Sequence, residues 1–254
     1  MTTRRTALTL GPTLGLTLGL VAAMTGVLAA PRLSSSGGEP ARGTSPAFDP
    51  AHFANPVNNP YFPLTPGLVT RLHGTDGEEK FVEKVRVTHR TKSIAGIPAV
   101  VVHDVVRRAD GTLAEATDDW YANDDQGNVW YLGEDTATYD EHGNLEDREG
   151  SWEAGVGGAE PGIILPADPR PPTATRLEYS KGVAEDQAWV VQRLGRVTTP
   201  GGRFTDVVRT LEWSRLEPRV ISQKFYAAGL GIVAERDLAA GDEHFWLVSH
   251  SRQS

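Results

Sequence analysis

The sequence predicts an all-β protein: an antiparallel meander that forms a strongly curved sheet or an incomplete β-barrel, with one long Gly/Pro-rich loop. Two observations lead to this prediction. From Gly67 onward, short apolar or β-branched runs alternate with turn residues, and almost no stretch has the apolar spacing of an amphipathic helix. Hydrophobic residues make up 39% of the chain and charged residues 23%, values typical of a globular domain.

The first 29 residues predict export. Arg4 and Arg5 precede a long uncharged apolar run that ends at Val27-Leu28-Ala29, a small-x-small cleavage site. We expect residues 1–29 to be a signal peptide or an uncleaved anchor, since the run is also long enough to span a bilayer. The protein is therefore expected to be secreted or associated with the cell envelope, with membrane contact only through an uncleaved N-terminal segment.

Two further segments complete the predicted organisation. Residues 30–52 are rich in Pro, Ser and Gly and poor in large apolar groups, which predicts a flexible tether. Residues 53–254 are expected to form a single β-rich domain. Its first part, NNPYFPLTPG (58–67), has too many prolines for a helix or a central strand. We expect this lead-in to be extended and packed across one end of the domain.

Beyond the lead-in, about eleven strands are expected from β-branched and aromatic runs bounded by Gly, Pro, Asn and Asp. A weaker hairpin is expected around 140–144. The predicted strand ranges are 68–74, 80–90, 98–108, 112–122, 128–135, 175–181, 188–199, 203–213, 219–227, 231–238 and 244–250.

Composition excludes several classes of function. The chain has 33 acidic and 25 basic residues and a net charge of −8, which argues against nucleic acid as a partner. It has no cysteine, so disulfides, thiolate metal sites and thiol catalysis are excluded. The letters G-x-G-x-x-A occur at 229–234 but precede a β-like run rather than a helix, and we expect no cofactor.

Residues 118–135, DDWYANDDQGNVWYLGED, hold two Trp-Tyr pairs and six carboxylates around one turn. The plainer interpretation is a hairpin that turns at 123–128, stabilised by cross-strand aromatic pairs, with its carboxylates facing solvent. The second is an aromatic platform for a sugar or a lipid. A calcium loop is a weaker third, because Ala122 and Gln126 fall where oxygen ligands are needed. A similar frame places Asp140 and Glu149 at ligand positions, but the helices of that motif are missing.

Residues 149–172, EGSWEAGVGGAEPGIILPADPRPP, are too long and too rich in Gly and Pro for a hairpin link. We expect an ordered loop packed over the sheet as a lid, and the first-choice location of a site. Glu153 follows a bulky aromatic, Trp152, and such a carboxylate can serve as a general acid. A glycosidase would need a second carboxylate nearby, and Glu134 and Asp135 are the candidates.

Several segments together resemble an uncharacterised group of exported bacterial β-rich proteins, described as hypothetical secreted or lipoprotein-like. They are NPYFPLTPG, DWYANDDQGNVWYLGED, GSWEAGVGGAEPGIILPADP, RVTTPGGRFTDVVRTLEW and KFYAAGLGIVAE. The resemblance covers nearly all of 56–238 and implies a single extracytoplasmic β-rich domain. The C-terminal half is also similar to curved-sheet proteins that carry lipids or lipoproteins across the periplasm. The lipobox cysteine of some members is missing here, and no activity is carried over.

Three hypotheses of function follow. The first is a non-enzymatic extracytoplasmic binding module for a lipophilic or glycan ligand. The second is a carboxylate-based hydrolase of envelope glycans with Glu153 as its acid. The third is a structural or protein-interaction domain. The residues expected at a ligand site are Trp120, Trp130, Tyr131, Trp152 and Glu153.

Overall fold

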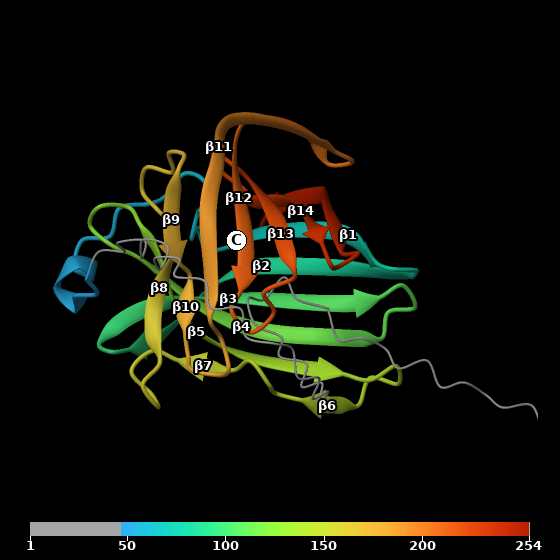
Figure 1. The fold of residues 1–254 in the computed structure, drawn as a ribbon, viewed down its shortest axis with the longest axis horizontal. Helices are drawn as coiled ribbons and strands as arrows, with labels where there is room; N and C mark the ends of the chain where they lie inside the picture. The colour runs from blue at the N-terminus through green and yellow to red at the C-terminus, as the bar shows by residue number, and fades with distance from the viewer. Residues whose placement is uncertain (1–46, 254) are drawn as a thin grey trace, which may run out of the picture.

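The computed structural model describes residues 47–253, and within them the chain is almost entirely β-strand (Figure 1). One short 3-10 helix, η1 (Pro50–Phe53), precedes the strands. The strands are β1 (Leu68–Asp76), β2 (Glu79–Ile94), β3 (Ile97–Arg108), β4 (Leu113–Asn123), β5 (Val129–Tyr139), β6 (Leu145–Asp147), β7 (Trp152–Glu153), β8 (Glu160–Leu165), β9 (Thr173–Arg176), β10 (Glu178–Tyr179), β11 (Asp186–Thr199), β12 (Gly202–Ser214), β13 (Ile221–Ala227), β14 (Gly231–Ala239) and β15 (His244–Arg252).

All strands belong to one antiparallel sheet, with the order β10-β8-β5-β4-β3-β2-β1-β15-β14-β13-β12-β11-β9. The short strands β6 and β7 pair with β5 outside this path. The sheet curls on itself, so that in Figure 1 the strands β11 to β13 pass across the strands β2 to β5. The result is a nearly closed barrel, which confirms the predicted fold class.

The seam of the barrel is spanned by one segment of chain. Strands β9 and β10 are separated only by Leu177, yet β9 pairs with β11 while β10 pairs with β8. The first and last strands of the sheet, β10 and β9, are therefore adjacent parts of one segment, residues 173–179. At this seam Gly162 of β8 lies so close to the carbonyl oxygens of Arg176 and Leu177 that a Cβ there would collide with backbone. A glycine is required where the two edges meet.

Strand alternation separates an outer face from an inner face, which we call the lumen. On β4, Glu115, Thr117 and Asp119 are buried toward the lumen, while Asp118 between them points outward and is partly exposed. A bulge between Trp120 and Tyr121 in the pairing with β5 shifts this register. The lumen therefore carries many polar side chains among its apolar ones.

The lead-in closes one end of the barrel, as expected. Gly229, in the turn between β13 and β14, donates a backbone hydrogen bond to the Pro60 carbonyl at 2.7 Å. The Tyr61 hydroxyl donates to Asp206 at 2.9 Å, and the Phe62 ring packs edge-on against Tyr121 with centroids 5.0 Å apart. These contacts fix an extended, proline-rich segment that has no ladder of its own.

The predicted N-terminal segments are described only in part. The predicted signal peptide, residues 1–29, and most of the predicted tether lie outside the described residues. The last residues of the tether are ordered: the Asp49 side chain accepts a hydrogen bond from Ala51 N, and the Phe48 ring packs against Phe53 at 5.7 Å. In the part of the chain that the structure describes, no helix has the length and apolar character needed to cross a membrane.

Most predicted strands match the structure within a few residues, and the predicted hairpin at 140–144 links β5 to β6. The prediction of a lid at 149–172 was wrong. This stretch contains β7 and β8, and β8 pairs with β5 and β10 as part of the barrel wall. The apolar run Ile163-Ile164-Leu165 is buried in the sheet. The preceding Pro161 and Gly162 are residue types typical of loops, which is why the sequence predicted a loop here.

Candidate functional site

The hairpin of residues 118–135 is confirmed, and its turn is organised by Asp124. This buried carboxylate accepts hydrogen bonds from Gln126 N at 3.0 Å, Asn128 N at 2.8 Å and Trp130 Nε1 at 2.9 Å. The expectation that all of the hairpin's carboxylates face solvent was wrong, since Asp119, Asp124 and Glu134 are buried. Asp124 therefore holds the backbone of the turn in place.

The aromatic side chains of the hairpin pack into the core. Trp120, Trp130, Tyr131 and Trp152 are each less than a tenth exposed. The Tyr121 and Tyr131 rings stack at 4.7 Å, and Trp152 meets Tyr131 edge-on at 5.4 Å. These contacts stabilise the hairpin, as cross-strand aromatic pairs do, and they leave no broad aromatic surface of the kind that a platform for a ligand requires.

One face of Trp130 nevertheless borders a groove of about 460 Å³. The turn between β7 and β8 and the first residues of β8 (154–161) supply one wall. The end of the tether, where Phe48 contacts the Trp130 ring at 5.4 Å, supplies another. An ion pair of 2.7 Å between Arg176 and Glu160 lies at the groove. The apolar residues that line it include Phe48, Ala95, Trp130, Ala154, Ala159 and Pro161. We call this the Trp130 groove.

Glu153 is engaged with a lysine on the outer face of the barrel. Its Oε2 lies 2.8 Å from Lys92 Nζ, and the same ammonium lies 3.2 Å from the centroid of the Trp120 ring. Glu134 is buried, whereas Glu153 is partly exposed beside Lys92. The arrangement gives Glu153 a cationic partner rather than the facing carboxylate that a glycosidase uses.

Asp140 and Glu149, the weaker candidates for a metal site, lie at turns, and Asp140 stabilises its own turn. The Asp140 side chain accepts hydrogen bonds from His142 N at 2.9 Å and Asn144 N at 2.8 Å, and its hydrogen bonds to Asn144 lower the pKa of that carboxyl. Glu149 is exposed at the next turn. Within residues 47–253, no three His, Asp or Glu side chains are grouped so that they could hold a metal ion.

A second cavity lies inside the barrel, under the lead-in. It has a volume of about 80 Å³, and we call it the lumen cavity. Phe62, Tyr121 and Tyr226 contribute rings to it, and Asp104, Asp119 and Lys224 contribute polar side chains. Its apolar walls include Leu68, Leu72, Val85, Val87, Val102 and Ile232. The lumen cavity and the Trp130 groove share no lining residue.

The lumen around this cavity has far more acidic than basic side chains. Lys224 is the one buried basic residue among residues 47–253, and its Nζ lies 3.2 Å from Glu212 and 3.8 Å from Glu235. The buried acids include Glu83, Asp104, Glu134, Glu178, Asp186 and Glu212. An unneutralised buried carboxylate holds its proton more tightly than one in water.

The pKa values of the lumen acids follow that expectation. Burial raises the pKa of Asp119 to about 7, although the Tyr131 and Tyr121 hydroxyls donate to its Oδ1 at 2.7 and 3.3 Å. Burial, followed by the charge of Asp104, raises the pKa of Glu83 well above its usual value. Burial also raises the pKa of Asp104. The lumen therefore retains protons near neutral pH.

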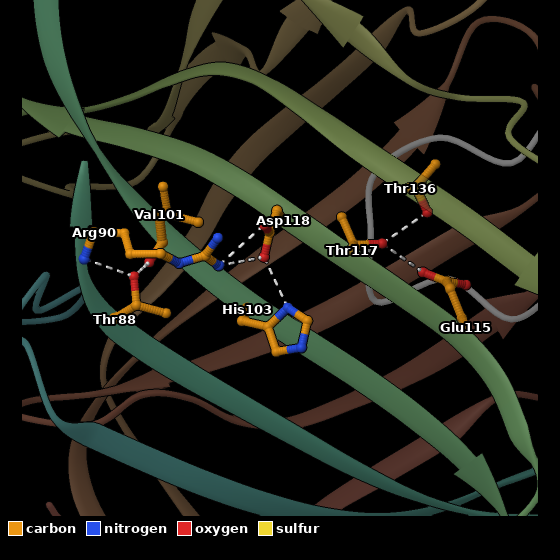
Figure 2. A network of polar contacts seen from close by, with 8 residues as sticks. All are labelled: Thr88, Arg90, Val101, His103, Glu115, Thr117, Asp118 and Thr136. Atoms are coloured by element: carbon orange, nitrogen blue, oxygen red, sulfur yellow. Dashed lines mark hydrogen bonds and ion pairs between the residues drawn. The ribbon is translucent and has the colours of Figure 1, made fainter. Parts of the chain in front are cut away.

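The two faces of the wall differ in their polar contacts (Figure 2). Asp118 accepts two hydrogen bonds from Arg90 Nη2, at 2.9 and 3.0 Å, and lies 2.7 Å from His103 Nδ1. Its neighbour Thr117 points to the lumen, where its hydroxyl lies 2.7 Å from the Thr136 hydroxyl. His103 and Asp104 lie on opposite faces of β3, as strand alternation requires.

The lumen acids were not identified from the sequence, although a signal for them was present. On β2, Phe81, Glu83, Val85 and Val87 are spaced two residues apart, and so are Val102, Asp104 and Val106 on β3. An acid on the apolar face of an alternating strand predicts a buried carboxylate. Of the five residues predicted for a ligand site, Trp130 lines the Trp130 groove. The other four line neither cavity and instead stabilise the hairpin or the outer face.

Two solved structures show a distant likeness to this chain. One solved structure is of a protein from Bacteroides fragilis, described as exported and as having a YmcC-like fold, with a TM-score of 0.43 and 17% identity over 75% of this chain and 98% of that chain. Another, described as a lipoprotein of Parabacteroides distasonis, has a TM-score of 0.43 and 14% identity over 77% of this chain and 100% of that chain. No protein-family model and no curated protein matches the chain. The descriptions coincide with the resemblance to exported β-rich proteins, and at these identities and scores they carry no argument about location, ligand or activity.

Proposed function

We propose that this protein is a non-enzymatic extracytoplasmic binding module whose ligand is lipophilic and lies in the Trp130 groove. The observation that carries the proposal is the groove, with a volume of about 460 Å³ and a mainly apolar lining. Pockets for small ligands are roughly 300–1,000 Å³ and are lined mostly by apolar and aromatic side chains with a few polar groups. The basic start and the apolar run at the N-terminus support the extracytoplasmic location.

The lining suggests how an amphiphile would lie. Its apolar chain would run over Trp130 and Phe48, where burial gives about 25 cal/mol per Å² of apolar surface. Its polar end would lie beside the ion pair between Arg176 and Glu160, whose side chains are 40% and 56% exposed. A fatty acyl ligand meets both requirements.

The proposal is tested by displacement of a fluorescent fatty acid from the purified protein. Ala95 lines the groove and is exposed, so Ala95→Trp fills the groove without a change in the core. Binding is expected to weaken about tenfold or more, which corresponds to ~1.4 kcal/mol. The matched control is Ala240→Trp, at an exposed turn residue that has a similar positive φ (59° against 49° at Ala95) and does not line the groove; it should bind as the wild type does. Equal binding by both variants would contradict the assignment of the groove.

Native mass spectrometry of the protein purified from its own host provides a second test. A lipid that co-purifies with the wild type and is lost from Ala95→Trp supports the proposal. A protein that carries no lipid and does not bind the fluorescent probe speaks against it.

A further inference from the structure

The lumen cavity combines acidic side chains with apolar walls, and no cation of the described residues is free to pair with those acids. Asp104 and Asp119 line it, and both are more than nine-tenths buried. Lys224 also lines it, but its ammonium is already held between Glu212 and Glu235. The carboxyl groups of Asp104 and Asp119 are therefore available to a ligand, because Lys224 is paired with Glu212 and Glu235.

Asp104 supplies a second and independent sign of a missing partner. Its Oδ1 is buried and accepts a hydrogen bond from no donor within residues 47–253. The neighbouring group is Glu83, whose two oxygens are also buried without a donor in that range, so these two acids can pair only by sharing a proton. A buried carboxylate oxygen without a donor is costly. The Asp104 carboxyl has hydrogen bonds with Val105 N and Glu83, but its Oδ1 has no donor, and Asp104 lines the cavity.

We propose that the lumen cavity binds a small organic ammonium ion, with Asp104 and Asp119 meeting its charge and the rings of Phe62, Tyr121 and Tyr226 enclosing its apolar part. Carboxylates give strong charge-assisted hydrogen bonds to ammonium groups. Aromatic faces attract the same cations, and desolvation strengthens that attraction. This site is independent of the proposed lipophilic groove.

The size and the walls of the cavity restrict the ligand. A dry cavity of about 150 Å³ is enough for benzene, so a cavity of about 80 Å³ suits an ammonium with only a few carbon atoms. Calcium and magnesium require a shell of about six or more oxygens, whereas Leu72, Val85 and Val102 occupy much of this wall. An alkylammonium satisfies the acids and the apolar side chains together.

Binding is expected to release protons, because the acids hold them in the empty site. Burial raises the pKa of Asp119 to about 7. An ammonium should therefore bind more tightly at about pH 8 than at about pH 6, by up to about tenfold per pH unit below 7. The titratable and charged groups that act on Asp104 and Asp119 are Glu83 from β2, His103 from β3, Tyr121 from β4, Tyr131 and Glu134 from β5, and Lys224 from β13.

The experiment is calorimetric titration of the full chain with propylammonium chloride, in two buffers of different ionisation enthalpy. Controls are 1-propanol, which has the apolar part without the charge, and potassium and calcium chloride at matched ionic strength. The expected result is saturable binding of propylammonium with proton release, and no saturable binding of 1-propanol. Failure of propylammonium to bind, or binding of potassium or calcium in its place, would overturn the proposal.

Variants locate the site. Asp104→Asn and Asp119→Asn are each expected to weaken propylammonium binding about 10- to 100-fold, the range for a hydrogen bond to a charged group. Asp118→Asn removes a carboxylate from the same strand but from the outer face, and it should bind as the wild type does. If one lumen variant does not fold, the other carries the comparison. Equal losses in Asp118→Asn and in the lumen variants would refute the assignment to the cavity. Displacement of the fluorescent fatty acid tests the Trp130 groove separately.

Discussion

Asp118 and Asp119 are adjacent in strand β4, yet they lie in opposite electrostatic environments. Asp118 faces outward, where Arg90 and His103 contact its carboxylate. Asp119 faces the lumen, where only tyrosine hydroxyls donate to it and burial raises its pKa to about 7. The comparison shows that the wall of this barrel separates a face whose charges are balanced from one whose charges are not. Strand alternation alone decides which acid belongs to which face.

The largest expected effect comes from removing the cation of the lumen. Lys224→Met leaves Glu212 and Glu235 without their buried partner, and loss of one member of a buried pair costs ~3–5 kcal/mol. Urea unfolding at neutral pH measures this loss. The outer counterpart is Lys92→Met, which breaks a partly exposed pair with Glu153 and removes the ammonium from the Trp120 ring; it should cost ~1–2 kcal/mol. Similar losses in the two variants would contradict the difference between the faces.

The second expected effect is a fall in stability as pH rises. The pKa of Asp119 is about 7 in the folded protein, against an ordinary value of 3.8 for an aspartate, so the native state binds more protons than the unfolded state between these limits. The free energy of unfolding should therefore fall across this window, by up to ~4 kcal/mol for this group alone. Urea unfolding from about pH 4 to pH 8 measures the slope. Asp119→Asn should flatten it and Asp118→Asn should not; a slope unchanged in Asp119→Asn would show that other acids carry it.

A smaller loss of stability is expected on removing the Tyr131 hydroxyl, which donates a hydrogen bond to Asp119. Tyr131→Phe removes a donor at 2.7 Å and should cost ~1–3 kcal/mol, because hydrogen bonds to charged groups are among the stronger ones. The same change should raise the pKa of Asp119 further, which NMR titration of its carboxyl carbon would detect. Tyr139→Phe, at the half-buried end of the same strand, is the control. A pKa of Asp119 that does not move in Tyr131→Phe would contradict the contact.

The smallest effect is expected on the outer face. Asp118→Asn removes contacts to Arg90 and His103 that are partly exposed, and such pairs contribute ~0–1 kcal/mol. The difference from the wild type should shrink at high salt, because salt screens exposed charges. Urea unfolding at low and high ionic strength measures it. A loss larger than that of Tyr131→Phe would reverse the ranking of the two faces.

The strands could be predicted because their signals are local. The predicted range 98–108 corresponds to β3 (Ile97–Arg108), since β-branched alternation and flanking turn residues are visible in the sequence itself. Strand β8 escaped prediction because Pro161 and Gly162 resemble loop residues. Its identity as a strand depends on pairing with β5 and β10, and its glycine is needed only because the end of β9 passes against it. Strand β5 lies far from β8 in sequence, so no local pattern reports that pairing.

The site was predictable to a lesser degree. The aromatic hairpin was correctly placed, but burial of Trp130 depends on Phe48 and Phe53, and Phe48 comes from a segment expected to be a flexible tether. Burial of the lumen acids could be inferred for each strand separately, because Glu83 and Asp104 each lie on the apolar face of an alternating strand. Their meeting across the barrel with a single lysine from β13 could not be predicted, because it depends on closure of the sheet.

The pairing of β1 with β15 has a consequence for synthesis of the chain. Within residues 47–253 these strands are the first and last in sequence, yet Leu68 is partnered with Arg252 in the finished ladder. One edge of β1 therefore remains without its native partner until β15 has been produced. An open strand edge is a template for pairing with other chains, and ends this far apart in sequence close slowly. A chain truncated before His244 would expose the edges of β1 and β14 together, so synthesis of β15 is itself a condition for closing this side of the barrel.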